Sequence, residues 1–143
     1  MPVPSTRADI VSSVLKNQIQ WSDIPTNFDM APNSGDLAKV TNGAAVAQSL
    51  ENLVMTVVKE RLYQPTVGST VAFRAFELAS PIEAVLMESA IMRTAKENEP
   101  RVNVIGVQVN EIPGGNAYQV LVYYYLINNP TLQTLSVILK RTR

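Results

Sequence analysis

The sequence predicts an α+β fold with an extended N-terminal arm, two main helices and a C-terminal three-stranded antiparallel β-meander. Three observations support this prediction. Apolar residues recur at helical spacing over residues 44–62, a second helix begins behind a capping signal at Ser80, and strand-like runs separated by turn residues fill 102–139. Because a chain of 143 residues suits one ordinary domain and is short for two, we expect one domain over residues 21–143, preceded by an extension over residues 1–20.

The N-terminal part of that plan has the weaker signals. Apolar residues at helical spacing predict a short helix over residues 5–17. The run 19–30, with aromatic and branched residues and one proline, indicates an extended segment at an edge. A cluster of turn residues then predicts a turn over 31–36.

The first main helix is predicted to begin after Thr41–Gly43, with Thr41 or Asn42 as its N-cap. It should end before Pro65, because the residue preceding a proline disfavours helical geometry. Its predicted core stripe consists of Val46, Leu50, Leu53, Val57 and Arg61. Gly68 indicates a turn, and residues 70–78 fit either a strand or a helical turn.

The second main helix has the strongest local signature in the chain. Ser80 is the predicted N-cap, Pro81 takes the first helical position, and Glu83 completes a capping box. The helix should end near Asn98, ahead of Pro100. Its predicted core stripe consists of Ile82, Val85, Leu86, Ser89, Met92 and Arg93.

The remaining residues predict three strands. A change of phase at Ile105–Gly106 indicates a β-bulge in the first of them. Hairpin turns are predicted at Pro113–Asn116 and Asn128–Thr131, on either side of an apolar central strand over 117–127. The predicted faces are Val102 with Val104, then Ile105 with Val107 and Val109, and in the last strand Leu135 with Val137 and Leu139.

The composition excludes several kinds of chemistry. The chain has no cysteine and no histidine, which rules out disulfides, thiolate chemistry, the usual zinc sites and His-dependent catalytic triads. No glycine-rich phosphate loop or calcium loop is present, so we expect no metal and no cofactor. A net charge of zero argues against nucleic acid as a partner. Neither a signal peptide nor a membrane span is indicated, so we expect a protein made in the cytoplasm.

Paired carboxylates are the remaining route to catalysis, since two acids suffice for glycoside hydrolysis. The candidates are Glu51, Glu60, Glu77, Glu83, Glu88, Glu97 and Glu99. No pair is marked by an apolar pocket that would raise a carboxyl pKa, and Glu83 has a structural use in the capping box. We therefore assign no catalytic residue.

Three features leave a structural and a functional interpretation open. The joint Glu99–Pro100–Arg101 is either a helix stop with solvated flanks or a docking site, because arginine offers a planar fork to carboxylates and carbonyls. The last strand, 132–139, is either an ordinary central strand or an edge to which a partner adds a strand. The run Tyr123–Tyr125 could stack bases but more readily packs a core. Charged residues make up only 17% of the chain, which favours a surface covered by partners.

Three strings resemble one known family: "SGDLAKVTNGAAVAQSLENLVMTVVKERLYQPTVGS", then "FEL", then "NEPRVNV". They are similar to the baseplate wedge protein of contractile-tailed bacteriophages, a small lysozyme-like family that also supplies a baseplate subunit of type VI secretion systems. The resemblance extends from about Trp21 to Leu139. The Glu-Pro-Arg triplet between a helix and a sheet is its most specific part.

The resemblance implies a structural role and not an enzymatic one. Glu99, Pro100 and Arg101 would dock on the helical core bundle of the baseplate wedge. The terminal strand would receive strands of the tail sheath protein, through the segment that contains Leu132, Thr134, Leu135, Val137 and Leu139. The protein would sit six-fold in the tail baseplate of a virion assembled in the host cytoplasm, beside the tail tube or neighbouring baseplate proteins. The alternatives are a type VI secretion baseplate subunit and a peptidoglycan hydrolase.

Overall fold

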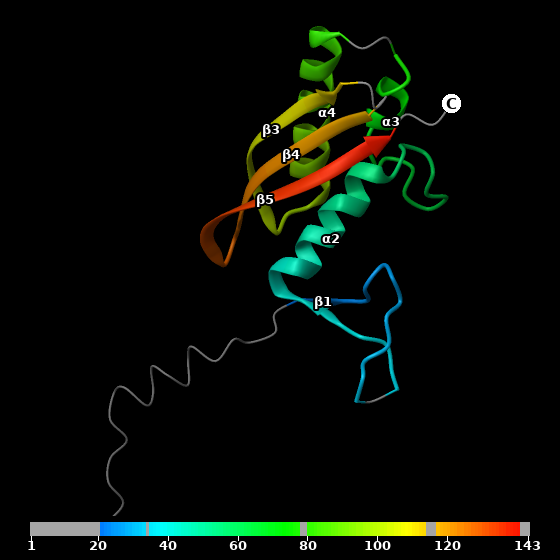
Figure 1. Cartoon of the computed structure of the whole chain (residues 1–143), viewed down its shortest axis with the longest axis vertical. Coiled ribbons are helices and arrows are strands. Elements are labelled where there is room, and N and C mark those ends of the chain that lie inside the picture. The colour runs from blue at the N-terminus through cyan, green and yellow to red at the C-terminus, as the bar shows by residue number, and fades with distance from the viewer. Residues whose placement is uncertain (1–20, 34, 78–79, 114–116, 141–143) are drawn as a thin grey trace, which may run out of the picture. The chain divides into compact units, whose positions relative to one another are not determined.

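The computed structural model describes residues 21–33, 35–77, 80–113 and 117–140. The chain divides into two compact units, Met1–Ala45 and Val46–Arg143, each of which is described by itself (Figure 1). The helix predicted over residues 5–17 and the predicted extension lie outside the described residues.

In the first unit, β1 (Ser22–Asp23) pairs antiparallel with β2 (Val40–Thr41). The segment between them folds back on itself, because the amide of Ala31 donates to the carbonyl of Asp36 at 2.8 Å. An isolated antiparallel bridge joins Met30 to Leu37. The turn predicted over 31–36 is therefore confirmed. The extended segment predicted over 19–30 is confirmed only at β1, because a turn in which the amide of Phe28 donates to the carbonyl of Pro25 at 3.0 Å interrupts it.

The first main helix, α2 (Asn42–Met55), begins two residues before the predicted start at Ala44 and ends seven residues before the predicted end at Leu62. The chain leaves the helix at Thr56, whose hydroxyl donates to the carbonyl of Asn52 at 2.7 Å. Val57 then forms a parallel bridge with Ser69. The β-branched run 56–58 favours this extended path over another helical turn.

The predicted stripe of α2 is confirmed only inside the helix. Val46, Leu50 and Leu53 are buried. Arg61 is exposed, and Val57 belongs to the loop that follows the helix. Within the ambiguous segment 70–78, residues Val71–Arg74 form a short helix, α3.

The second main helix, α4 (Pro81–Asn98), confirms the predicted start and end. Ser80 is the N-cap, and its hydroxyl accepts a hydrogen bond from the amide of Glu83 at 3.2 Å. The predicted core stripe is wrong, since Ile82 and Val85 are 72% and 60% exposed. The buried residues are instead Met87, Ala90, Ile91, Thr94 and Ala95. Most of these are small, which lets the helix pack closely on β3.

The sheet is the predicted three-stranded antiparallel meander, in the order β3 (Val102–Ile112), β4 (Ala117–Leu126) and β5 (Asn129–Lys140). The predicted central strand is therefore central, and the first hairpin is confirmed by the pairing of Ile112 with Ala117. The second turn lies at 127–128, earlier than predicted, and Pro130 falls inside β5. A proline near the start of an edge strand costs no ladder hydrogen bond on its open side.

The predicted bulge is confirmed as a register shift between Val104 and Gly106. The bulge places the residues after it on a different face of the sheet from the predicted one. Val107 and Val109 pair with Val122 and Val120, so the bulge returns them to the inner face that Val104 occupies. Ile105 alone is turned outward and is 53% exposed.

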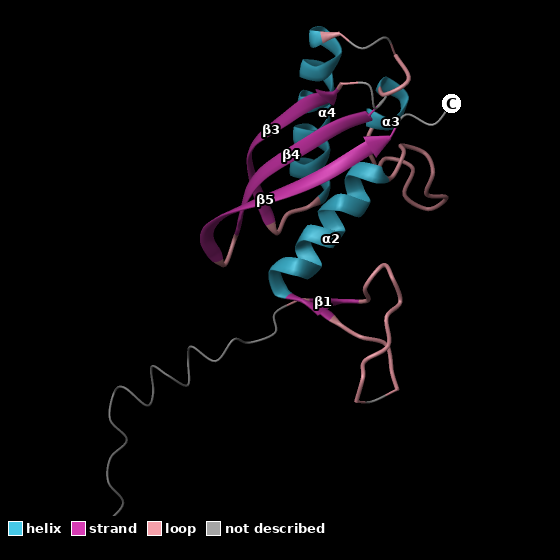
Figure 2. Ribbon diagram, in the orientation of Figure 1, coloured by secondary structure: helices cyan, strands magenta, loops and turns pink. Residues whose placement is uncertain are grey.

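Helices cover one face of this sheet (Figure 2). Alternate residues of β4, including Val120, Val122 and Tyr124, are almost fully buried on that face. On the opposite face, Leu132 and Ile138 are more than half exposed. The α+β fold class is confirmed, and the core lies between the sheet and the helices.

Replacement of Gly68 by alanine should lower the free energy of unfolding by about 1–3 kcal/mol. Gly68 has a φ of +134°, and a Cβ there would lie 2.8 Å from the carbonyl oxygen of Thr56. Urea denaturation of the purified chain measures the change. Gly106→Ala is the matched control, because nothing lies within 4 Å of a Cβ at that position. Equal stability of the two variants would contradict the argument.

Candidate functional site

The joint Glu99–Arg101 connects the end of α4 to the start of β3. Glu99 caps the helix, and its amide donates to the carbonyl of Ala95 at 2.9 Å. Pro100 is exposed, and the side chain of Arg101 is 33% exposed. Glu99 is only 4% exposed, so the prediction of solvated flanks is wrong for this residue.

A closed set of hydrogen bonds holds the Glu99 carboxylate. The Nε and Nη2 atoms of Arg101 each donate to one carboxylate oxygen at 2.6 Å, which is the bidentate geometry of a strong ion pair. The hydroxyl of Ser49, on α2, donates to Oε2 of Glu99 at 2.7 Å and accepts from Nη2 of Arg101 at 3.0 Å. The carboxylate therefore fixes the orientation of the guanidinium.

Two opposing effects act on the pKa of Glu99. Burial by itself raises the pKa, because it disfavours the charged carboxylate. The hydrogen bonds from Arg101 and Ser49, together with the charge of Arg101, outweigh burial and lower the pKa below its usual range. Glu99 is therefore ionised at neutral pH.

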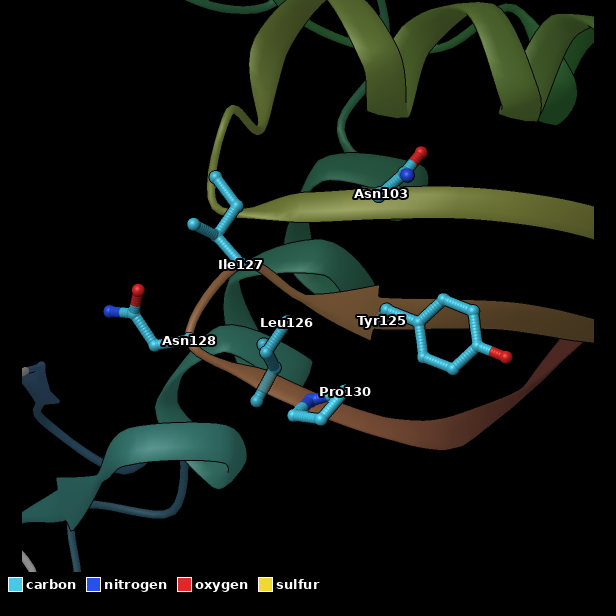
Figure 3. Close-up of a pocket in the computed structure, with 6 residues that line it drawn as sticks. All are labelled: Asn103, Tyr125, Leu126, Ile127, Asn128 and Pro130. Carbon is cyan, nitrogen blue, oxygen red and sulfur yellow. The ribbon is translucent and has the colours of Figure 1, made fainter.

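The backbone of the joint also holds the β4–β5 turn. The amide of Ile127 donates to the carbonyl of Arg101 at 3.1 Å. Beside this contact lies a surface hollow, shown in Figure 3, lined by Asn103, Tyr125, Leu126, Ile127, Asn128 and Pro130. Ile127 is 67% exposed at its rim. The joint and an apolar hollow thus form one continuous surface at this end of the sheet.

The second candidate surface is the outer edge of β5. Within the described part of the chain, β5 pairs with β4 and with no other strand, so its interpretation as a central strand is wrong. Leu132 and Thr134 are exposed, whereas Val137 and Leu139 are buried and Leu135 is half-buried on the inner face. Lys140 is the one charged residue of β5.

The opposite edge of the sheet, β3, is covered differently. The Oε1 atom of Glu88, on α4, accepts a hydrogen bond from the amide of Val109 at 2.9 Å. The bulge at Val104–Gly106 also interrupts this strand. Both are devices that blunt an edge against further pairing. Among the described residues, the edge of this sheet that stays regular is β5 from Leu132 to Lys140, whereas Pro130 and a register shift interrupt the start of that strand.

Sequence reasoning missed Ser49 and the bond that Glu88 accepts from the β3 edge. Ser49 lies 50 residues before Glu99, and no local pattern links the two positions. Its polar side chain next to the buried Leu50 is the one available signal, and it is weak.

Four of the seven carboxylates considered for catalysis have structural partners. Besides Glu88 and Glu99, Glu83 pairs with Arg74 at 3.2 Å, and Glu60 accepts from the amide of Val57 at 2.9 Å. No group of three or more potential metal ligands occurs among the residues placed in the structure. No helix in the same residues is long and apolar enough to cross a membrane.

Glu99→Gln should destabilise the fold by about 1–3 kcal/mol at pH 7, because the amide cannot replace the charged acceptor of Arg101. The folded pKa of Glu99 is lowered, so its contribution is complete above the unfolded value of about 4.3 and is lost as the pH falls through the folded pKa. The difference between wild type and variant should therefore shrink as the pH falls below about 5.

Urea denaturation at a series of pH values tests this expectation. The control is Glu97→Gln, because Glu97 is an exposed carboxylate on the same helix. A stability difference for Glu99→Gln that stays constant with pH would contradict the role assigned to the ion pair.

No protein-family model and no curated protein matches this sequence. Solved structures do share its fold. A Geobacter sulfurreducens protein named "putative tail lysozyme" matches with a TM-score of 0.63 and 18% identity, over 68% of this chain and 89% of that one. A chain of the anti-feeding prophage baseplate, six-fold symmetrised, matches with a TM-score of 0.58 and 17% identity, over 86% and 87%.

A chain of the baseplate of post-contraction R2 pyocin matches with a TM-score of 0.49 and 18% identity, over 80% of this chain and 98% of that one. Identities this low establish similarity of fold. The chain thus has a fold found in the "putative tail lysozyme" and in the anti-feeding prophage baseplate.

Proposed function

We propose that this protein is a structural component of the baseplate of a contractile tail or tail-like particle. The observation that carries the proposal is the fold shared with a chain of the anti-feeding prophage baseplate, over nearly the whole of both chains. The sequence resemblance to baseplate wedge proteins supports the same role independently of the fold. In this role the protein has one surface for the wedge and another for the sheath.

The wedge surface is the joint Glu99–Arg101. Glu99 is almost completely buried and offers little surface to a partner. Its role is to hold Arg101 in place. The exposed third of the Arg101 side chain and the exposed Pro100 then meet the helical core bundle. A fixed guanidinium suits helix carbonyls and carboxylates because little side-chain entropy remains to be lost. The apolar hollow beside it would take a side chain of the bundle.

The sheath surface is the open edge of β5. A strand added there would form a continuous antiparallel or parallel ladder along Leu132–Lys140, beyond the register shift at the start of β5. Leu132 and Thr134 would flank the new strand on the outer face, and Leu135, Val137 and Leu139 on the inner face. Each main-chain hydrogen bond contributes about 0.5–1.5 kcal/mol net, so anchoring the sheath through contraction needs many bonds in parallel. A six-fold arrangement around the tail tube would supply them.

Two other roles are compatible with the fold. A type VI secretion baseplate subunit would use the same two surfaces, and the neighbouring genes distinguish it from a phage protein. A peptidoglycan hydrolase is suggested by the name of the Geobacter protein. Glu83 and Glu88 already bind Arg74 and the amide of Val109, which favours the structural role. Muramidase activity lost in Glu83→Gln or Glu88→Gln would instead support the hydrolase.

Arg101→Ala should reduce incorporation of the protein into particles by about tenfold or more, because the fixed guanidinium is the central polar contact with the wedge. Quantitative mass spectrometry of purified particles from a complemented deletion strain measures its copy number. The matched control is Arg93→Ala, which removes an exposed arginine from α4. Circular dichroism checks that both variants fold. Normal incorporation of Arg101→Ala would reject the docking role.

Thr134→Lys should leave incorporation into the baseplate unchanged but reduce sheath assembly several-fold, because a lysine in the middle of an edge strand opposes further pairing. Electron microscopy of particles, with the fraction carrying sheath counted, measures this outcome. Asn110→Lys places the same charge on β3, at the opposite edge, and should have no effect. Sheathed particles at the wild-type frequency would argue against strand addition at β5.

A further inference from the structure

The most exposed large apolar side chains of the described residues lie together on one loop. Leu62 is 91% exposed and Tyr63 is 97% exposed. They occupy the tip of the segment 56–69, here called the tip loop, which follows α2. Neither the joint nor the edge of β5 includes it.

The tip loop is held firmly at its base. The amide of Ser69 donates to the carbonyl of Thr56 at 2.8 Å, and its hydroxyl donates to the carbonyl of Val54 at 2.7 Å. The hydroxyl of Thr94, on α4, donates to the carbonyl of Gly68 at 3.3 Å. These bonds connect the base of the loop to the end of α2 and to α4. The exposed tip is therefore held in position from its base.

Hydrogen bonds also order the interior of the loop. The amide of Lys59 donates to the carbonyl of Pro65 at 2.9 Å, and that of Val67 to the carbonyl of Gln64 at 3.1 Å. The first bond closes the backbone around Leu62 and Tyr63, and the second closes the turn that follows them. A loop ordered in this way loses little entropy when its tip is bound.

The charges beside the tip are arranged asymmetrically. The carboxylate of Glu60 turns back to the base and accepts from the amide of Val57 at 2.9 Å. Lys59 and Arg61 are exposed, and neither forms an ion pair with another described residue. The outward surface of the loop is therefore an apolar tip flanked by two cations.

The tip of the loop lies away from the wedge surface. The joint contacts the β4–β5 turn, where β5 begins. The end of α2, from which the loop emerges, lies beside Leu139 and Lys140, where β5 ends. Figure 1 shows the loop that follows α2 and the α4–β3 connection at opposite ends of the sheet. A partner of the tip loop would thus contact a different region from the partner of the joint.

We propose that the tip loop is a third interaction surface, which inserts Leu62 and Tyr63 into an apolar pocket bordered by carboxylates on a neighbouring protein subunit. The apolar tip selects a pocket that excludes water, and Lys59 and Arg61 select its acidic border. Tyrosine is a frequent anchor of this kind because it buries a large area with few rotatable bonds. The proposal rests on the proposed function in one respect, namely that the neighbour belongs to the same particle.

Hydroxyl-radical footprinting of the wild-type protein is the first test, since it needs no variant. Tyr63 should be strongly modified in the free chain and at least about fivefold less in assembled particles. Equal modification of Tyr63 in both samples would overturn the proposal. If the wild-type chain is absent from particles, the proposed function fails instead, so the two failures are distinguishable.

Variants provide the second test. Leu62→Ser combined with Tyr63→Ser should lower the copy number per particle by about tenfold, and Lys59→Glu combined with Arg61→Glu should lower it similarly. Lys59→Gln with Arg61→Gln should have a smaller effect, because it removes attraction without adding repulsion. Gln64→Ala, at another exposed position of the loop, should have none. Normal incorporation of the Leu62–Tyr63 variant, with an unchanged urea midpoint, would overturn the proposal.

Discussion

The carboxylate of Glu99 imposes the constraint on which the second unit depends. It is nearly inaccessible to water, so it must be both paired and hydrogen-bonded. Arg101 supplies the charge, and Ser49 supplies a hydroxyl that bonds to both partners. Loss of one partner from a buried pair typically costs about 3–5 kcal/mol, and less where one side chain is partly exposed, as Arg101 is.

This cluster links elements that are distant in sequence. Ser49 comes from α2, Glu99 ends α4, and Arg101 begins the path into β3. Through its carbonyl, Arg101 also holds the amide of Ile127 in the β4–β5 turn. One polar network therefore positions the end of α4, one side of α2 and the β4–β5 hairpin. A group that fixes this much structure is well suited to present a rigid contact surface.

The sheet is asymmetric in two ways, and both matter for binding. Helices bury one face, and Glu88 with the bulge protects one edge. The edge of β5 is interrupted only at its start, by Pro130 and a register shift, and it carries a single charge at its end. An open regular edge is a liability for an isolated protein but a template for pairing with a chosen partner. The low overall charge of 17% is consistent with a surface that is covered in an assembly.

Local interactions in the sequence were sufficient to predict several elements. The cap at Ser80, the bulge at Gly106, the hairpins and the order of the strands depend on residues a few positions apart. The apolar periodicity also predicts α2 up to Met55, and the sequence alone points to the joint and the last strand as candidate sites.

Tertiary structure decided the rest. The end of α2 depends on the bridge between Val57 and Ser69, which competes with helical hydrogen bonds. Two faces of α4 are apolar, and only packing on β3 selects the one with Ala90 and Ala95. Ser49 joins Glu99 and Arg101 across 50 residues. The sequence by itself determined the elements and their order, because these follow from interactions between neighbours along the chain. The folded structure alone decided which faces are buried and which polar groups meet, because both depend on contacts between distant segments.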